Sequence, residues 1–299
     1  MTERYSNRAH FADDNFVVCG GKINSMLHSK KIENAVPEFY SFASSLLFRV
    51  LRGFSRDIHY QMRHPLETNS ILARKAGVSD ADRVLDAGCG QGSSVFWLAK
   101  HYACQIDAIT VSKGEFECVD EAVRSLNYRD KIRVFEENML ATHFSDNTFT
   151  IVWAVESLCH VDEKMAFLKE AMRIMAKGGR LVILDFFLTE ELISPIDIRN
   201  YERFCEGMLF PSLTTKSEFL RMLEVAGFHN VQFDAYEQEI KSSIFDREIS
   251  GWLGVIMSSP IALLRRTEGI FLKNSRASIA QGSLFRRKKL SYGVVYAEK

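Results

Sequence analysis

The stretch at residues 83–100, RVLDAGCGQGSSVFWLAK, constrains the fold more than any other part of the chain. An apolar run typical of a strand is followed by clustered glycines and then by a segment with helical spacing. A strand, a glycine turn and a helix in this order form the first unit of a doubly wound α/β sheet. Ligands of such sheets bind beyond the carboxyl ends of the strands, where this turn lies. The turn is therefore the first candidate for a ligand site.

Strand-like runs alternate with helical segments along the rest of the chain. The runs are RVLDAG, QIDAITVS, KIRVFE, FTIVWAV, RLVILDFF and VQFDAY, and the predicted helices between them lie at 93–102, 113–126, 162–176 and 215–226. Apolar strands that alternate with helices predict a parallel sheet covered on both faces. The predicted fold class is α/β, and 299 residues are enough for one such domain with additions.

Three segments fall outside this alternation. Residues 1–80 are expected to form an N-terminal helical cap segment, because apolar residues recur at helical spacing in PEFYSFASSLLFRVLRGFSRDIHY. The core is placed at 81–299, with cap insertions at about 188–214 and 240–281, and the final strand SYGVVYAEK follows the second insertion. Together these segments would cover the ligand end of the sheet. The alternative is that they are peripheral helices.

Composition and charge exclude several kinds of partner. The chain has 38 basic and 38 acidic residues, so no global field gathers nucleic acid, and we expect no nucleic-acid partner. The apolar run GWLGVIMSSPIALL is shorter than the roughly 20 residues of a membrane span. The six cysteines show neither a CxxC pair nor a zinc-ligand spacing, which indicates reduced thiols and no metal site of that kind. With a polar start that lacks the form of a signal peptide, these features favour a soluble, cytoplasmic protein.

The spacing of the glycines discriminates between three kinds of ligand. A P-loop needs GxxxxGK[ST], and no lysine follows Gly88, Gly90 and Gly92 in that pattern. A dinucleotide turn needs GxGxxG and an acid at the tip of the second strand, whereas this chain has GxGxG and Thr110 at that tip. Asp86 precedes the glycines, and its carboxylate would repel a pyrophosphate but suit a ligand with cationic groups. S-adenosyl-L-methionine, which carries a sulfonium, an ammonium and a nucleoside, matches this chemistry.

The stretch VLDAGCGQG resembles motif I of the class I S-adenosylmethionine-dependent methyltransferases, and the later segments follow in family order. The likeness covers roughly residues 57–187, and the last strand more loosely. It implies an enzyme with a Rossmann-like, doubly wound, seven-stranded sheet whose last strand is antiparallel, together with a helical cap. The alternative from another class is a binding protein that keeps the cofactor fold without catalysis, and nothing in the sequence favours it.

The resemblance implies a cofactor site residue by residue. Asp86 and the backbone of Gly88, Cys89 and Gly90 would hold the methionine end of S-adenosylmethionine. Many members carry an acid for the ribose at the tip of the second strand, and a subgroup with T-[LI]-S-x-x-Q uses the glutamine instead. Here T-V-S-K-G-E puts a glutamate in that place, and a carboxylate can accept both ribose hydroxyls. The residues of this stretch are Thr110, Val111, Ser112 and Glu115.

Two further segments resemble parts of the family's cofactor site. ENMLATHF resembles the adenine-edge segment, which implicates Asn138 and Met139. DIHYQM resembles an IHxG motif that closes over the cofactor, which implicates His59 and Tyr60. The two residues after Tyr60 depart from the family's Gly-aromatic pair.

The fourth strand ends in VWAVESLCHVD, with Glu156 at its carboxyl tip and His160 four residues later. An oxygen or nitrogen acceptor needs a base to remove its proton. An alkene carbon becomes a carbocation instead, which needs aromatic faces, an anion and then a base. This stretch resembles the C-methyltransferases of prenyl diphosphates and sterols, in which a glutamate here faces the cation. A glutamate also stands here in tocopherol-like and small-molecule O- and N-methyltransferases.

The sequence thus predicts methylation of a hydrophobic small molecule in specialised metabolism, with the alkene carbon of a terpenoid or prenyl diphosphate as first choice. The predicted catalytic residues are Glu156, His160, Tyr60 and His59. Capture of the cation within a polyene would couple methylation to cyclisation. The alternative is an O- or N-methyltransferase of a polyketide, sugar or alkaloid, with one of the histidines as base. Aromatic residues of the caps would suit a greasy substrate, namely Phe39, Tyr40, Phe42, Phe48, Phe54, Phe186, Phe187, Tyr201, Phe204, Phe210, Trp252 and Phe271.

A diphosphate substrate would add two requirements. Basic side chains near DIHY would contact it, namely Arg49, Arg52, Arg56, Arg63 and His64. Mg²⁺ would serve only in that case, and the chain has no DDxxD-like pair to hold it. Capping segments of this kind sometimes exchange between subunits, so the sequence is also compatible with a homo-oligomer.

Overall fold

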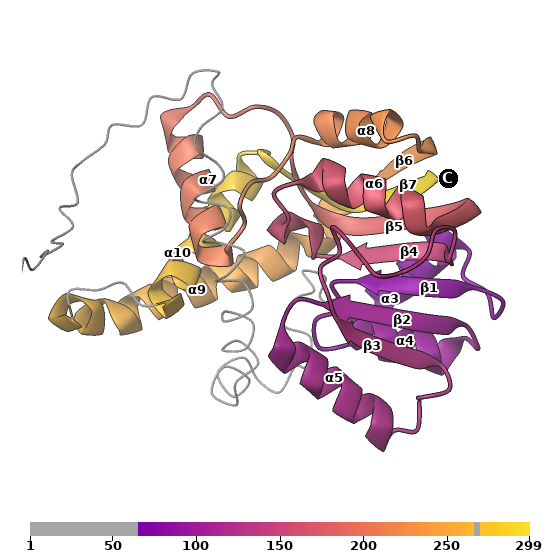
Figure 1. Ribbon diagram of the computed structural model, residues 1–299. Coiled ribbons are helices and arrows are strands. Elements are labelled where there is room, and N and C mark those ends of the chain that lie inside the picture. Colours follow the sequence, from indigo (N-terminus) through magenta and orange to yellow (C-terminus); the bar gives the residue numbers. More distant parts are fainter. Residues whose placement is uncertain (1–64, 266–269) are drawn as a thin grey trace, which may run out of the picture.

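The computed structural model describes residues 65–265 and 270–299, which form a mixed seven-stranded sheet flanked by helices (Figure 1). The strands are β1 (Arg83–Ala87), β2 (Gln105–Thr110), β3 (Ile132–Glu136), β4 (Phe149–Val155), β5 (Met175–Leu188), β6 (His229–Ala235) and β7 (Leu290–Glu298). Their order is β3-β2-β1-β4-β5-β7-β6, and β1 to β5 pair in parallel. Strand β7 is antiparallel to both β5 and β6. This arrangement confirms the predicted sheet and the antiparallel last strand.

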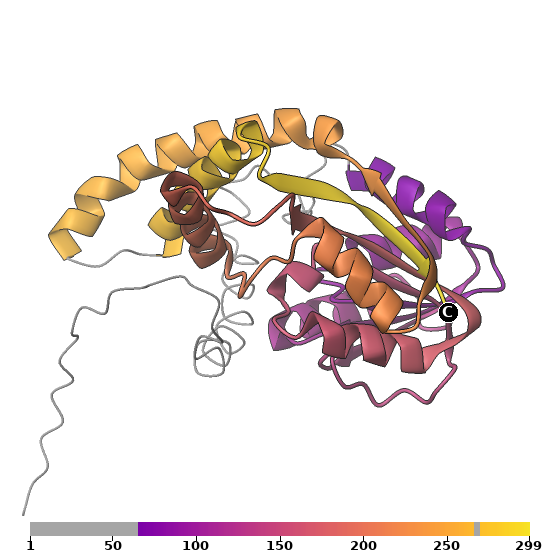
Figure 2. The same ribbon diagram turned by 90° about the horizontal axis from the view of Figure 1, so that it is seen from above.

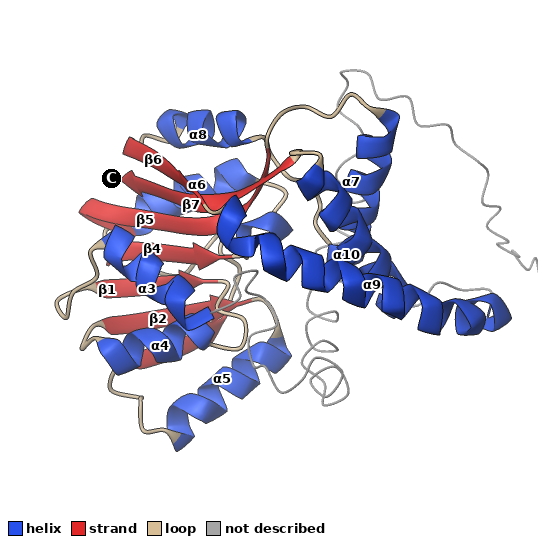
Figure 3. Ribbon diagram, turned by 180° about the vertical axis from the view of Figure 1, so that it is seen from behind, coloured by secondary structure: helices blue, strands red, loops and turns tan. Residues whose placement is uncertain are grey.

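Helices cover both faces of the sheet because the central strands are apolar on both sides. In β4, Ile151 and Trp153 belong to one buried cluster, and Val152 and Ala154 to the other. This alternation follows from the period of two of a β-strand. Helices α3 (Pro65–Ala76), α4 (Ser93–His101) and α5 (Lys113–Ser125) pack on the first cluster. Helices α6 (Lys164–Ile174) and α8 (Lys216–Val225) cover the other face (Figure 3).

Three helices project beyond the carboxyl end of the sheet: α7 (Pro195–Met208), α9 (Glu237–Arg265) and α10 (Ile270–Arg286) (Figures 1 and 2). Close contacts join α10 to its neighbours. A Cβ on Gly207 of α7 would lie 2.3 Å from a backbone oxygen of α10, and one on Gly251 of α9 would lie 2.6 Å from another. The basic run RRKK at residues 286–289 forms ion pairs to three parts of the chain. Arg286 pairs with Glu248 of α9, Arg287 with Asp197 of α7, and Lys289 with Glu190 in the segment between β5 and α7.

The boundaries of several elements differ from the prediction, and β5 begins at Met175 rather than Arg180. Helix α6 ends at Ile174, whereas the sequence pattern extends the helix to residue 176. Met175 is fully buried and pairs with Phe149, so the chain turns from helix to strand without a loop. Strand β6 begins at His229 rather than Val231, because His229 pairs with Glu298 of β7. The helices expected before residue 61 lie outside the described residues. Within the described ranges, every helix is too short or too polar to cross a membrane.

Candidate active site

A pocket opens at the carboxyl ends of β1, β2 and β4, where the sequence places the ligand site. Every predicted cofactor residue contributes to its lining, and so do two of the four predicted catalytic residues. These lining residues are Asp86, Gly88, Cys89, Gly90, Thr110, Val111, Ser112, Glu115, Asn138, Met139, Glu156 and His160. The other two predicted catalytic residues, His59 and Tyr60, lie outside the described residues, as do the basic side chains at 49–64.

The glycine turn after β1 packs directly against the loop after β4. Gly88 has a φ of 87°, and a Cβ there would lie 2.5 Å from Cβ of Ser157. The backbone N–H groups of Gly88 and Cys89 both donate to the carbonyl of Ile109, over 2.9 and 3.0 Å. The Ser157 hydroxyl donates to the carbonyl of Ala87 over 2.7 Å. These contacts leave a bare backbone surface that a ligand can approach closely.

Asp86 places a carboxyl group at the floor of this turn. Its side chain is 2% exposed, and Oδ2 has no hydrogen-bond partner within the described part of the chain. Burial raises the pKa of Asp86 to about 7. A buried carboxylate without a partner is costly, and a cationic ligand would relieve that cost. The site therefore fits the amino group of S-adenosylmethionine better than an anionic ligand.

We expect Asp86 to make the cofactor-free protein less stable as the pH rises. Its pKa is near 4 in the unfolded chain and about 7 when folded, so the folded state binds more protons between these values. Its contribution is therefore complete below pH 4 and is lost as the pH rises through 7, at no more than about 1.4 kcal/mol per pH unit. Urea unfolding at pH 5, 6, 7 and 8 should show a shallower decline for Asp86→Asn. Asp185, whose pKa burial raises to about 6, leaves a residual slope in both proteins. Parallel declines would contradict the prediction.

Thr110 and Glu115 form one hydrogen-bonded unit on the ribose side of the predicted site. The Thr110 hydroxyl, at the end of β2, donates to Oε2 of Glu115 over 2.7 Å. Ser112 caps α5 by accepting a hydrogen bond from the backbone N–H of Glu115. Glu115 is 5% exposed, and burial raises its pKa against the opposing effect of the Thr110 hydrogen bond. The structure thus brings together the two residues that the sequence named as alternatives for this position.

We expect Glu115→Leu to weaken binding of S-adenosylhomocysteine by about 10- to 100-fold, the equivalent of one or two hydrogen bonds to a charged group. Glu115→Gln should cost only a few fold, since an amide keeps one acceptor. Isothermal titration calorimetry measures both effects. Glu117→Leu, on an exposed face of the same helix, is the matched control and should bind normally. Equal affinities for the Leu variants would remove Glu115 from the site.

The segment after β3 also lines the pocket, through Asn138 and Met139. Oδ1 of Asn138 accepts a hydrogen bond from the backbone N–H of Leu140 over 2.9 Å, so this side chain shapes the loop. Cε of Met139 lies 3.1 Å from the Cβ position of Gly88, which places the thioether against the glycine turn. Val111 is 42% exposed at the pocket edge. Ser157, which was not among the predicted site residues, lines the pocket beside Gly88, and its place directly after Glu156 is a sequence signal for that position.

Glu156 and His160 both line the pocket and differ in electrostatic character. Oε1 of Glu156 accepts a hydrogen bond from the Tyr292 hydroxyl over 2.8 Å. Nδ1 of His160 lies 3.2 Å from the carbonyl of Leu209, and because a carbonyl only accepts, Nδ1 carries the proton. Burial lowers the pKa of His160 to about 4. His160 is therefore neutral near pH 7 and a weak base, whereas Glu156 supplies a carboxylate.

The cap aromatics whose side chains the structure describes pack in the core or lie exposed, which is the commoner role of aromatic residues at helical spacing. Phe186, Phe204 and Phe210 pack edge-to-face in the core, with centroid distances of 5.9 and 5.3 Å along this series. Phe187 packs on the other face of the sheet, and Trp252 is 54% exposed on α9. None of these five lines the pocket. Phe210 contacts the ring of His160 edge-on and supports it from behind.

The doubly wound sheet with its antiparallel last strand is the fold of the class I S-adenosylmethionine-dependent methyltransferases. Residues 85–183 match the family described as methyltransferase domain, and the chain therefore carries a methyltransferase domain. This identifies the catalytic class and the cofactor, S-adenosylmethionine.

The chain is similar to methyltransferases with several acceptors. It is 27% identical to O-methyltransferase resE of Aspergillus sclerotiorum over 214 residues, which are 69% of this chain and 80% of that protein. It is 32% identical to geranyl diphosphate 2-C-methyltransferase of Saccharopolyspora erythraea over 124 residues, or 40% of this chain and 43% of that protein. A solved geranyl diphosphate methyltransferase in complex with SAM shares the fold with a TM-score of 0.62 and 21% identity, and the match covers 78% of this chain and 84% of that one.

Proposed function

We propose that the protein transfers a methyl group from S-adenosylmethionine to an alkene carbon of a hydrophobic terpenoid, with a prenyl diphosphate as the first acceptor to test. The carboxylate of Glu156 in the pocket wall, beside a neutral His160, supports this proposal most directly. A carboxylate suits an acceptor that becomes positively charged on carbon. The likeness to geranyl diphosphate 2-C-methyltransferase favours the same acceptor class.

The proposed chemistry assigns separate tasks to the residues of the pocket. S-adenosylmethionine supplies an electrophilic methyl group on its sulfonium. Asp86 and the glycine turn bind the methionine end, and Glu115 binds the ribose. Attack by the alkene on the methyl carbon would form one carbon–carbon bond while the sulfur–methyl bond breaks. S-adenosylhomocysteine would leave as a neutral thioether, and the positive charge would pass to the neighbouring alkene carbon. Glu156 stabilises that charge and then accepts a proton from the adjacent carbon, which restores a double bond.

Helices α7, α9 and α10 are proposed to act as the cap that closes this end of the sheet. They project beyond the carboxyl ends of the strands, on the side where the pocket opens (Figure 2). A cap would exclude water from the cation, because water would otherwise capture it.

Transfer to oxygen or nitrogen is the second candidate function. Its support is the likeness to O-methyltransferase resE, which covers more of the chain than the likeness to the prenyl enzyme. Such a reaction needs a base for the acceptor proton. His160 is poorly suited, because its pKa is lowered to about 4.

Methyl-deuterated S-adenosylmethionine and a mixed acceptor panel would test the proposal. The panel contains prenyl diphosphates of several lengths, a sterol, phenols and amines, each with and without Mg²⁺, and mass spectrometry locates the label. Label on carbon of a prenyl acceptor supports the proposal. Label only on oxygen or nitrogen contradicts it and favours the second candidate.

A further inference from the structure

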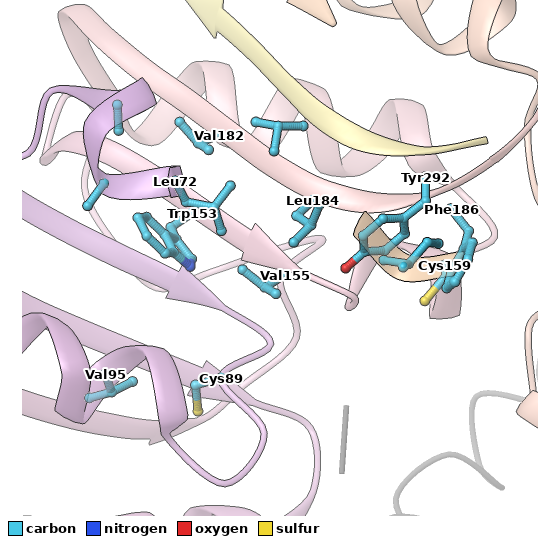
Figure 4. Packing of buried hydrophobic residues seen from close by; sticks show 14 of the residues in the cluster. Leu72, Cys89, Val95, Trp153, Val155, Cys159, Val182, Leu184, Phe186 and Tyr292 are labelled. Atoms are coloured by element: carbon cyan, nitrogen blue, oxygen red, sulfur yellow. The ribbon is translucent and has the colours of Figure 1, made fainter. Parts of the chain in front are cut away.

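Tyr292 and Glu156 meet in the fold although 136 residues separate them in the sequence. Tyr292 belongs to β7 and is 1% exposed, and its ring lies 4.8 Å from that of Phe186 between centroids (Figure 4). Phe186 and Tyr292 are also register partners in the ladder between β5 and β7. The carbonyl of Tyr292 accepts a hydrogen bond from the backbone N–H of Tyr236. Packing and backbone pairing thus fix the direction in which the phenol presents its hydroxyl.

The backbone of Glu156 is held just as firmly. Its φ is 47°, in the left-handed region that non-glycine residues rarely adopt. Its backbone N–H donates to the carbonyl of Leu184 over 2.8 Å, and its carbonyl lies 3.5 Å from the thiol sulfur of Cys159. With the backbone anchored at the end of β4, the orientation of the carboxylate depends on the partners of its own oxygens. The Tyr292 hydroxyl is such a partner.

We propose that Tyr292 is a positioning residue, which orients the Glu156 carboxylate in the pocket wall and stabilises its ionised form. The inference rests on the proposed role of Glu156 as the cation-facing group. A hydrogen bond donated to a carboxylate favours the charged form. Other charged and titratable groups face this pair. Arg247 of α9 interacts electrostatically with both Glu156 and Tyr292, Cys159 and His160 follow Glu156 in the chain, and Asp185 of β5 contacts Cys159.

The chain offers a matched control on the same strand. The Tyr296 hydroxyl donates to Oε1 of Glu298 over 2.6 Å, so it forms the same kind of tyrosine–glutamate hydrogen bond away from the pocket. Tyr292→Phe and Tyr296→Phe therefore remove the same chemical group from β7. Only the first substitution removes the donor to Glu156.

An NMR titration of the full chain tests the contact without any acceptor. The protein carries ¹³C at glutamate Cδ, and Glu156→Gln assigns the Glu156 signal. We expect Tyr292→Phe to move the titration midpoint of Glu156 to higher pH by about one unit, and Tyr296→Phe to leave it in place. An unmoved midpoint in Tyr292→Phe overturns the inference. If that variant does not fold, 3-fluorotyrosine at position 292 strengthens the donor and should move the midpoint to lower pH. An unmoved midpoint there also overturns it.

Kinetics then separate this inference from the proposed function. With geranyl diphosphate, or whichever acceptor of the panel is methylated, Tyr292→Phe should lower kcat about tenfold with KM nearly unchanged. The acid limb of the pH–rate profile should move to higher pH. Glu156→Gln/Tyr292→Phe should be no slower than Glu156→Gln alone. A further loss in the double variant contradicts the inference. Full turnover by Glu156→Gln contradicts the proposed function instead, while the NMR titration still decides the contact.

Discussion

Glu156→Gln should lower kcat about 10²- to 10³-fold and leave the affinity for S-adenosylhomocysteine unchanged. The amide keeps the size of the side chain but removes the negative charge, and the loss of one charge-stabilising group in an enclosed site typically costs this much. Glu156 lines the pocket wall after β4, on a different element from Asp86 and Glu115, the residues predicted to bind the cofactor. The cofactor should therefore bind equally well to the variant.

Stopped assays with the acceptor found in the panel measure kcat, and calorimetry measures the cofactor affinity. Glu121→Gln, on the exposed side of α5, removes the same charge outside the pocket and should behave as the unaltered protein. An unchanged kcat in Glu156→Gln would exclude a role for its charge. A fall in both kcat and cofactor affinity would point to a damaged site rather than to lost catalysis.

Gly88→Ala should abolish cofactor binding and destabilise the fold by roughly 3 kcal/mol or more, which is the range of severe steric and strained-backbone substitutions. Two effects combine at this position. The φ of 87° is strained for alanine, and the new Cβ would lie 2.5 Å from Cβ of Ser157. Relief would require the turn and the loop after β4 to separate, which would displace Glu156 as well.

Gly178→Ala separates these two effects. Gly178 has a φ of 73°, but a Cβ there would meet no atom of the described residues within 4 Å. Backbone strain alone should cost about 1–2 kcal/mol, with normal cofactor affinity. Urea unfolding and calorimetry on both variants give the comparison. Similar losses in the two variants would show that the Gly88–Ser157 contact is unimportant.

The sheet and the residues that line the pocket were predictable because their signals are local. Each central strand is a continuous apolar run, and Thr110 and Glu115 stand five residues apart, within reach of one another across a strand–helix turn. The pairing of Tyr292 with Glu156 was not predictable, because it depends on β7 lying beside β5 in a particular register. The packing partners of the cap aromatics were not predictable for a related reason, because helical spacing shows that a helix face is buried but not which element covers it.

The position of β7 between β5 and β6 has a consequence for biosynthesis. During translation, β5 and β6 emerge from the ribosome before β7. Until β7 has emerged, the sheet lacks the strand that lies between β5 and β6. The edge of β5 that is unpaired at this stage is buried and apolar in the folded protein, notably at Leu181, Ile183 and Leu184. Unpaired apolar edges readily recruit strands from other chains. A chain that ends before Leu290 would therefore be prone to aggregation and would be bound by chaperones or degraded, rather than persist as a less active enzyme.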